Sequence, residues 1–372
     1  MIVMNLKLDN MYGFCDFDIN FSYPKKIIGS TIPNETLKRK NNFRYKKINV
    51  IMGQNASGKT TFGLALMKIF NFIVKNDISS LEKTINNKKE AGYFSIDFLV
   101  DENYLYRVSY KFYNIEEDDE SPSIDKNILE VYSSKINKND SYESARSKLK
   151  PITNNEQSID INSLRNLFKG KMGWMFRLTN GSEDFEFNFK DHTLDLVVLE
   201  KVLQSLDPDI ISVEKLNIED SYVINKKTHS IIIQNGKIID ENKLSSGTKA
   251  GINIANVISS VMLRRYGFYF CDEKFSFIHS DLEQAVLSLL IEKLGDNEQL
   301  FITSHNAELL DMDLPKHAFT FFKKQKCIDI VYPSDYLKKN NSSLSMAVKN
   351  DLFNIAPDLE KIYEIGELTH EE

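Results

Sequence analysis

The 372-residue chain is poor in cysteine, with three, and in tryptophan, with one. Cys15, Cys271 and Cys327 are too far apart to form a metal-ligand pattern, and their odd number is typical of reduced thiols in cytoplasm. No apolar run is long enough to span a bilayer. Lys7 and Asp9 come too early for the apolar core of a signal peptide. These absences predict a soluble, cytoplasmic protein with no membrane partner.

An excess of positive charge is also missing, because 47 basic residues face 53 acidic ones and the net charge is −6. Bulk electrostatics therefore do not indicate nucleic-acid binding, although a local basic face stays open. The content of 42% hydrophobic and 27% charged residues is ordinary for a globular protein. The length suggests two domains or one large interrupted domain.

Apolar periodicity predicts an α/β fold with a parallel or mixed core sheet, an antiparallel β portion and a helical insertion. We expect an N-terminal lobe at 1–113, an insertion of mixed structure at 114–190 and a C-terminal lobe at 191–372. The acidic run Glu116–Glu120 in the insertion is interpreted as a solvated tip or linker. The loop at 22–47 is expected to be polar. The expected strands are two within 1–22, then 48–52, 93–100, 104–112, 210–213, 222–224, 231–234, 268–271, 300–303 and 318–322, and the expected helices are 60–75, 193–206, 244–263 and 281–294.

A phosphate-binding loop is indicated between the strand at 48–52 and the helix at 60–75. The residues match G-x-x-x-x-G-K-[ST] and are Gly53, Gln54, Asn55, Ala56, Ser57, Gly58, Lys59 and Thr60, and we include the adjoining Thr61 in the site. Glycines let backbone N–H groups curl inward around phosphate oxygens, and the start of the helix adds partial positive charge. Lys59 is expected to bridge the β- and γ-phosphates of ATP, and the Thr60 hydroxyl to ligate Mg²⁺.

Asp272 and Glu273 end the apolar strand that begins near Phe268. Ligands of open α/β sheets gather at the carboxyl ends of the strands, so this pair is expected beside the phosphate loop. Asp272 would hold Mg²⁺ directly or through water. Glu273 would accept a proton from the attacking water or orient it.

A second anion site is indicated where Leu244-Ser245-Ser246-Gly247-Thr248 opens a helix. The segment resembles the signature motif of ABC-type ATPases, with Ser246 where glycine is usual and Thr248 where glutamine or glutamate is usual. The resemblance implies that Ser245, Ser246 and Gly247 contact the γ-phosphate held by an opposite subunit, so a homodimer completes the site. An ordinary N-capped helix is the alternative interpretation.

Two further segments follow the same family order. Ile302-Thr303-Ser304-His305 resembles the segment with the switch histidine, which implies that His305 senses the γ-phosphate and the attacking water. Residues 277–281 occupy the position of the D-loop, which lines the dimer seam. A histidine after a strand is otherwise an ordinary surface residue.

Together these motifs resemble the ABC-type heads of SMC-like and overcoming-lysogenisation-defect (OLD)-like ATPases, and especially the stand-alone ATPases of bacterial phage-defence operons. The resemblance covers the first 60 or so residues and roughly 240–325. Three departures stand out. The glutamine of the Q-loop has no clear counterpart, with Gln157 an unsupported candidate; Lys274 replaces a frequent proline; and the insertion is too short for a long coiled coil. Because roughly 50 residues follow Phe322 in this sequence, we expect no nuclease domain of the kind that OLD-like proteins carry.

Two weaker patterns each have two interpretations. The basic stretch Lys38–Lys47, with Phe43 and Tyr45 interleaved, could follow a nucleic-acid backbone or cover adenine, but a solvated loop is the more frequent case. The cluster at 169–177 around Trp174 could anchor a partner protein, and core packing is the alternative.

We therefore expect a Mg²⁺-dependent ATPase whose nucleotide-driven dimerisation controls an effector protein from the same operon, such as a nuclease or toxin, in anti-phage defence. A higher oligomer is left open. The main rival is an SMC-like ATPase of DNA repair or recombination that clamps DNA. A transporter ATPase subunit and a non-hydrolysing scaffold are further rivals.

Overall fold

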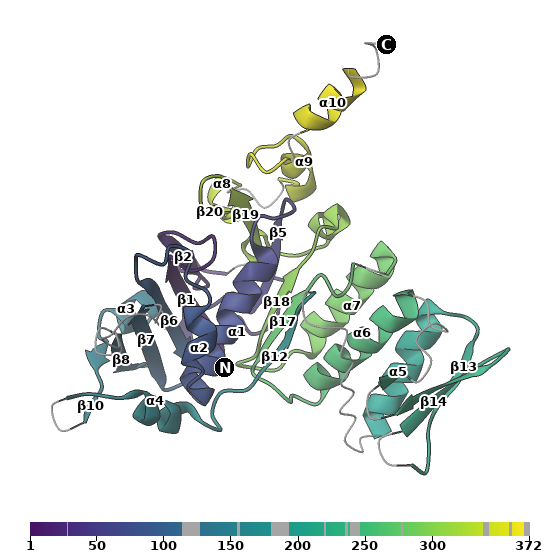
Figure 1. Cartoon of the computed structure of the whole chain (residues 1–372), viewed down its shortest axis with the longest axis horizontal. Coiled ribbons are helices and arrows are strands. Elements are labelled where there is room, and N and C mark those ends of the chain that lie inside the picture. Colours follow the sequence, from purple (N-terminus) through teal and green to yellow (C-terminus); the bar gives the residue numbers. More distant parts are fainter. Residues whose placement is uncertain are drawn as a thin grey trace.

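The computed structural model describes residues 1–27, 29–113, 127–154, 157–179, 193–218, 221–234, 237–238, 246–276, 278–337, 342–356 and 359–367. The acidic run 116–120 lies outside these described residues. Two six-stranded sheets, one mainly parallel and one antiparallel, stand on either side of a long helix (Figure 1).

The core sheet has the strand order β12-β17-β18-β5-β19-β20. Its neighbours are parallel except for β19 and β20, which form an antiparallel edge. The strands are β5 (Ile48–Gly53), β12 (Trp174–Arg177), β17 (Phe268–Asp272), β18 (Gln299–Thr303), β19 (Phe319–Lys324) and β20 (Ile328–Val331). The predicted core strands are thus confirmed, and the fold class is a mixed α/β fold as expected.

The antiparallel sheet has the order β2-β1-β6-β7-β8-β9. Its strands are β1 (Ile2–Asp9), β2 (Phe17–Asn20), β6 (Gly92–Leu99), β7 (Tyr104–Phe112), β8 (Ile128–Lys135) and β9 (Lys150–Pro151). The predicted hairpin corresponds to β6 and β7, which pair in register from Gly92 with Phe112 to Phe98 with Tyr106.

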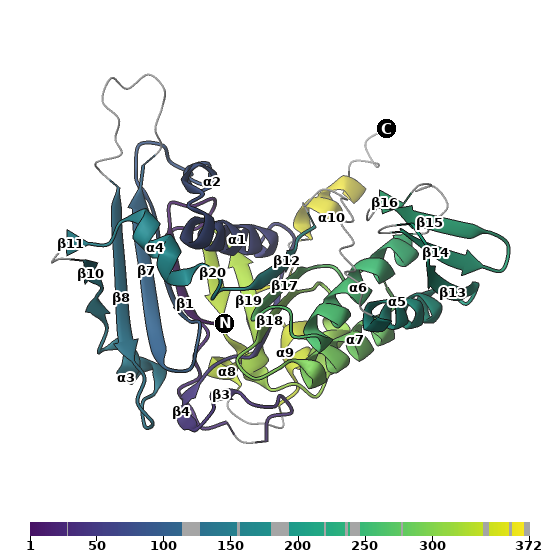
Figure 2. The same ribbon diagram turned by 90° about the horizontal axis from the view of Figure 1, so that it is seen from below.

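Helix α1 (Lys59–Lys75) fills the space between the two sheets, as both views show (Figures 1 and 2). Its buried face packs on one side of β17, where Phe268 and Phe270 point into the same aromatic cluster as Phe62 and Phe70 of the helix. The helix begins after Gly58 and ends at Asn76, which both adopt left-handed backbone. Such residues are common at helix ends because glycine and asparagine tolerate positive φ.

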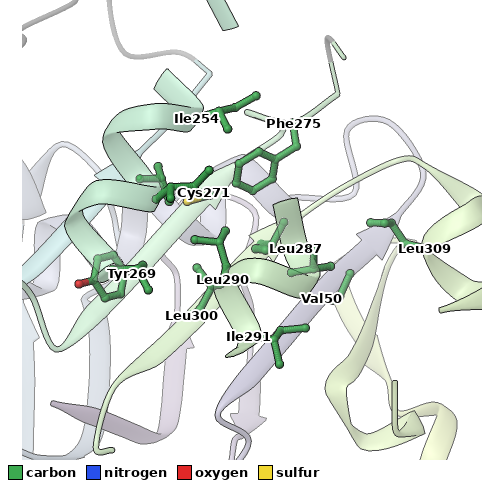
Figure 3. Packing of buried hydrophobic residues seen from close by; sticks show 14 of the residues in the cluster. Val50, Ile254, Tyr269, Cys271, Phe275, Leu287, Leu290, Ile291, Leu300 and Leu309 are labelled. Carbon is green, nitrogen blue, oxygen red and sulfur yellow. The ribbon is translucent and has the colours of Figure 1, made fainter. Parts of the chain in front are cut away.

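The other face of the core sheet is covered by α6 (Ser246–Met262) and α7 (Ser280–Lys293). Tyr269 and Cys271 of β17 alternate with the phenylalanines above and pack against this layer (Figure 3). Beyond α6 lie α5 (Thr193–Leu206) and a four-stranded sheet. Its strands are β13 (Ile210–Lys215), β14 (Ser221–Lys226), β15 (Ser230–Gln234) and β16 (Lys237–Ile238).

The predicted insertion is divided between several structures. β8 extends the antiparallel sheet, and β12 forms the parallel edge of the core sheet beside β17. Met172 and Met175 are buried and Trp174 packs edge-on against Phe70, which favours core packing for the aromatic cluster. The remaining elements are α3 (Tyr142–Arg146), β10 (Thr153–Asn154), β11 (Gln157–Ser158) and α4 (Ile161–Phe168). The domain boundaries stay a prediction.

The segment expected as a polar loop at 22–47 is partly wrong, because it contains β3 (Thr36–Leu37) and β4 (Lys40–Arg44). Phe43 and Tyr45 are fully buried, as is Lys47, whose Nζ donates to the carbonyls of Pro33 and Leu294. Phe43 and Tyr45 are two residues apart and both point into the interior, so neither ring can stack on a base or contact a nucleic-acid strand.

The cysteine prediction is also wrong. Cys15 and Cys327 form a disulfide with a Cα–Cα separation of 5.9 Å, and only Cys271 among the three is a free thiol. The turn before β2 and the turn between β19 and β20 meet in space although 312 residues separate the two cysteines. Sequence spacing gave no sign of this pairing.

The smaller helices complete the chain: α2 (Ile78–Glu82), α8 (Pro333–Tyr336), α9 (Leu344–Lys349) and α10 (Glu360–Glu367), with 3-10 turns at Ala307–Asp311 and Lys316–Ala318. α10 extends away from the body of the molecule (Figure 1). In the described part of the chain, no helix has both the length and the apolar character needed to cross a bilayer.

Candidate nucleotide-binding site

The phosphate loop connects the centre of the core sheet to α1. β5 ends at Gly53 with φ 151°, and Gly58 precedes the helix with φ 98°. A Cβ on Gly53 would overlap the backbone carbonyl of Phe322 on β19. Both positions therefore require glycine, for the close approach at one and the left-handed turn at the other.

Lys59 folds back over its own loop. Its Nζ donates to the carbonyls of Gly53 and Gln54, each at 3.1 Å. Burial lowers the pKa of Lys59, while the nearby carboxylates of Glu273 and Asp272 oppose that shift. Ser57 Oγ is buried and has no hydrogen-bond partner among the residues that the structure describes. A cation and an unsatisfied hydroxyl inside one glycine loop suit a bound anion.

Asp272 is completely buried at the end of β17, and neighbouring strands hold both of its oxygens. Thr303 Oγ1 donates to Oδ1 at 2.6 Å, and Thr179 donates to Oδ2 through Oγ1 at 2.6 Å and through its backbone N–H at 3.2 Å. Thr303 lies opposite Asp272 on β18, between the loop strand β5 and β17. The carboxylate is thus fixed in orientation before any ligand arrives.

Glu273 and His305 lie together at this edge, with Oε1 and Nε2 2.6 Å apart. Glu273 has a left-handed backbone with φ 51°, and its N–H donates to both the carbonyl and the hydroxyl of Thr303. A non-glycine residue in this conformation costs energy and is frequent at functional sites. The conformation turns Glu273 away from the strand direction and toward the histidine.

A buried glutamate on α7 fixes the turn that carries His305. Glu283 accepts from Ser304 Oγ at 2.9 Å and from Asn306 Nδ2 at 2.8 Å. Because these two residues flank His305, the glutamate limits the positions that the imidazole can take. Sequence reasoning missed Glu283, Thr303 and Thr179 as site residues, and single polar residues at strand ends or on a helix carry no distinguishing pattern.

A pocket of about 630 Å³ opens beside the loop. The loop lines one side with Gly53, Gln54 and Asn55, and His305 lies in its wall. The C-terminal segment closes another side, where Gln54 Nε2 donates to the carbonyls of Ile355, at 3.2 Å, and Ala356. The pocket thus adjoins the start of the loop and His305, and its wall includes a segment remote in sequence.

The predicted signature is described only from Ser246, where α6 begins; Leu244 and Ser245 lie outside the described residues, as does the side chain of Ser246. Gly247 lies in the first turn of that helix. In the D-loop region Phe277 is also outside them, and His279 caps α7 by accepting from the Asp281 N–H. Gln157 belongs to β11 and pairs with Asn154 of β10, and Figure 2 shows this hairpin on the far side of the antiparallel sheet from the loop.

The residues present fit a magnesium–triphosphate ligand better than a metal ion alone. In the described ranges no group of three or more His, Cys, Asp or Glu side chains could hold a metal ion. Mg²⁺ is commonly bound by one or two carboxylates with phosphates and water completing its shell. The predicted ligands, Thr60 and Asp272, would form such a partial set.

The loop, the carboxylate pair and the histidine lie at one edge of a core sheet that has the fold of an ABC-type P-loop ATPase head. Residues 48–311 match the family described as "AAA domain, putative AbiEii toxin, Type IV TA system". The match spans more than half of the chain, and the protein belongs to this family.

Solved structures support the fold. An SmcHead bound to the C-winged helix domain of ScpA aligns with a TM-score of 0.54 and 13% identity, covering 91% of this chain and 100% of that one. The Smc head domain with an extended coiled coil bound to the C-terminal domain of ScpA, from Pyrococcus furiosus, aligns with a TM-score of 0.52 and 11% identity, covering 90% and 98%. No curated protein gave a significant match.

Proposed function

We propose that the protein binds ATP with Mg²⁺ in the loop Gly53–Thr60 and hydrolyses the γ-phosphate. The observation that carries this proposal is that Lys59 follows the loop strand β5, while Asp272 and Glu273 lie at the end of β17, which only β18 separates from β5. A cation for phosphate, a carboxylate for metal and a second carboxylate for water are the parts that phosphoryl transfer to water requires.

Each residue has a distinct role in this proposal. Lys59 neutralises charge on the β- and γ-phosphates, and Thr60 with Asp272 holds Mg²⁺, which stabilises the developing charge. Glu273 orients the attacking water and accepts its proton, and His305 positions Glu273 through their 2.6 Å contact. Backbone N–H groups from Gln54 to Thr61 cradle the phosphates.

Ser245, Ser246 and Gly247 of a second copy would complete the site in a homodimer. The exposure of the proposed catalytic pair supports this, because His305 and Glu273 keep 36% and 26% of their side chains exposed. The proposed hydrolysis requires that bulk water be excluded from the site, and an opposing subunit would exclude it. ATP then closes the dimer and hydrolysis releases it.

We further propose that nucleotide state is passed to an effector protein in a cytoplasmic anti-phage defence module. The family description names a toxin of a toxin–antitoxin system, and the solved heads of similar fold were each bound to another protein, which supports a protein partner. A DNA clamp is less well supported, because the buried Phe43 and Tyr45 remove the local basic-aromatic face on which it depended.

The decisive experiment measures Mg–ATP affinity, ATP turnover and dimer formation for the wild type and Lys59→Ala. The proposal expects the variant to lose binding, turnover and ATP-dependent dimerisation together. Lys83→Ala, at the end of α2, serves as the matched control for a lost lysine charge. If Lys59→Ala keeps the affinity of the wild type, the loop is not the nucleotide site.

A further inference from the structure

The Cys15–Cys327 disulfide lies next to the phosphate loop, a position that no sequence motif indicates. Cys327 is followed by Ile328, the first residue of β20, which is buried. A Cβ on Gly58 would overlap the Cδ1 atom of this isoleucine, so its side chain rests directly on the backbone at the start of α1. The disulfide-bonded Cys327 is therefore the chain neighbour of a residue that contacts the loop directly.

The same isoleucine also contacts the turn that holds the other cysteine. A Cβ on Gly13 would lie 3.5 Å from Ile328 Cδ1, and Cys15 follows two residues later. Within the hairpin, the Gln325 N–H donates to the Cys327 carbonyl. Two turns thus enclose Ile328 against Gly58, and the disulfide is the covalent link between them.

The disulfide is also accessible to a reagent in solution. Cys15 is exposed and Cys327 is half-buried. Exchange requires a thiolate to reach a sulfur atom, and exposed disulfides are the ones that undergo it. Disulfides of cytosolic proteins, where they occur, are mostly transient and redox-sensing.

We propose that Cys15 and Cys327 are a reversible thiol–disulfide modification site that controls the order of the phosphate loop. Its effect on nucleotide affinity rests on the proposed function. In the oxidised protein the link holds Ile328 on Gly58 and keeps the loop arranged for phosphate. In the reduced protein the two turns separate, the packing on Gly58 loosens and the loop gains freedom that a ligand must remove.

The reaction partner is a dithiol in one direction and a disulfide in the other. A thiolate of the dithiol attacks Cys15 Sγ, the bond to Cys327 breaks, and Cys327 leaves as a thiolate that takes up a proton. The second thiol of the reductant then attacks the mixed disulfide and releases Cys15 as a thiol. Two electrons and two protons pass from the dithiol to the protein, and the reductant becomes a disulfide.

The test compares wild-type protein treated with dithiothreitol or with oxidised glutathione. Thiol titration after denaturation should find the three cysteines free in the first sample and only Cys271 in the second. Amide hydrogen exchange of residues 53–60 without nucleotide should be faster in the reduced protein. The Kd for Mg–ATP should rise by about three- to tenfold on reduction, a loss of pre-organisation.

Cysteine variants distinguish the effect of breaking the Cys15–Cys327 disulfide from other effects of the reducing agent. Cys15→Ser and Cys327→Ser should behave as reduced protein under both conditions. Cys271→Ala should respond like the wild type, because Cys271 is completely buried and takes no part in the disulfide.

Each result has a defined meaning. Three free thiols after oxidation, or equal exchange of residues 53–60 in both states, would overturn the proposed redox site. Equal ATP affinity together with unequal exchange would remove its effect on ligand binding. Absence of ATP binding in both states, with unequal exchange, would contradict the proposed nucleotide function and leave the redox site standing.

Discussion

His305 Nε2 lies 2.6 Å from Glu273 Oε1, and the two residues follow the ends of the adjacent parallel strands β18 and β17. Glu273 reaches this contact through a left-handed backbone that Thr303 holds with two hydrogen bonds. The sheet thus positions the pair, because parallel strands present their carboxyl ends at one edge.

Replacing Glu273 with Gln should lower ATP turnover by about 100-fold or more, since a general base contributes on that scale. ATP affinity should be kept, because the loop supplies the phosphate contacts, and the ATP-bound dimer should accumulate. Steady-state hydrolysis and size-exclusion chromatography with ATP measure both. Glu308→Gln removes an exposed carboxylate three residues beyond His305 and should hydrolyse normally. Unchanged turnover in Glu273→Gln would argue for a nucleotide-dependent scaffold.

Thr303→Val should both raise the Mg²⁺ concentration needed for turnover and lower the free energy of unfolding. The hydroxyl donates to Asp272 and accepts from the Glu273 N–H, so its loss leaves a buried carboxylate with one partner fewer. We expect a cost of about 1–3 kcal/mol in unfolding free energy and a higher Mg²⁺ requirement for turnover.

Thr320→Val is the matched control for that change. Thr320 is equally buried on β19, and its hydroxyl donates to Asn49 instead of to the carboxylates. Its variant should lose stability without a shift in Mg²⁺ dependence, which urea unfolding and a magnesium titration would separate. Parallel behaviour of the two variants would contradict a positioning role for Thr303.

Gly63→Ala should destabilise the fold because α1 passes very close to β17 at this residue. An added Cβ would overlap the ring of Phe270 and lie 2.9 Å from Leu178 Cδ2. Overpacking of this kind costs about 1–3 kcal/mol, which thermal or urea unfolding detects. At Gly173 the atoms that a new Cβ would approach within 4 Å, in the described part of the chain, belong to Tyr266 at 3.9 Å, so Gly173→Ala should be tolerated. Equal unfolding free energies for Gly63→Ala and Gly173→Ala would contradict the close packing of α1 on β17.

Stability should rise with pH above neutrality because of Lys46. Burial lowers the pKa of its ammonium from 10.5 to about 7, and the group lies over the ring of Tyr332. Between these pH values the unfolded chain binds a proton that the folded chain does not, so raising the pH favours folding by up to about 1.4 kcal/mol per pH unit. Below pH 7 the group is protonated in both states and this contribution is absent.

Urea unfolding from pH 6 to pH 9 measures this profile for the wild type and Lys46→Met. The variant should be more stable than the wild type at pH 6, and its stability should depend less on pH. Lys38→Met, an exposed change in the same region, controls for the loss of a charge. A wild-type slope that survives in Lys46→Met would assign the effect to other groups.

The sequence predicted the elements with strong local signals. β5, α1, β17 and β18 were found within a residue or two, and α5 at its bounds, because apolar periodicity and glycine placement are local properties. The motif residues of the loop and the pair Asp272–Glu273 therefore fell at the correct strand and helix ends.

Features that depend on distant pairing were missed. β12 is four residues long and is defined as a strand by its pairing with β17. Because that pairing leaves no local pattern, the sequence alone assigns this segment to the insertion. Thr179, which follows it, acquires its contact with Asp272 from the same pairing. Lys46 and Lys47 looked solvated because charge dominates local patterns, although tertiary packing buries both.

The hydrogen bonds from Gln54 to the carbonyls of Ile355 and Ala356 connect the phosphate loop directly to the segment 342–356. α10 starts a few residues later and projects into solvent with Tyr363 67% exposed (Figure 1). A displacement of Gln54 would therefore disturb its hydrogen bonds to Ile355 and Ala356 directly, without passing through the core sheet. A fluorescent probe at Tyr363 would test whether a movement of the phosphate loop reaches α10, and it would leave the residues of the loop unchanged.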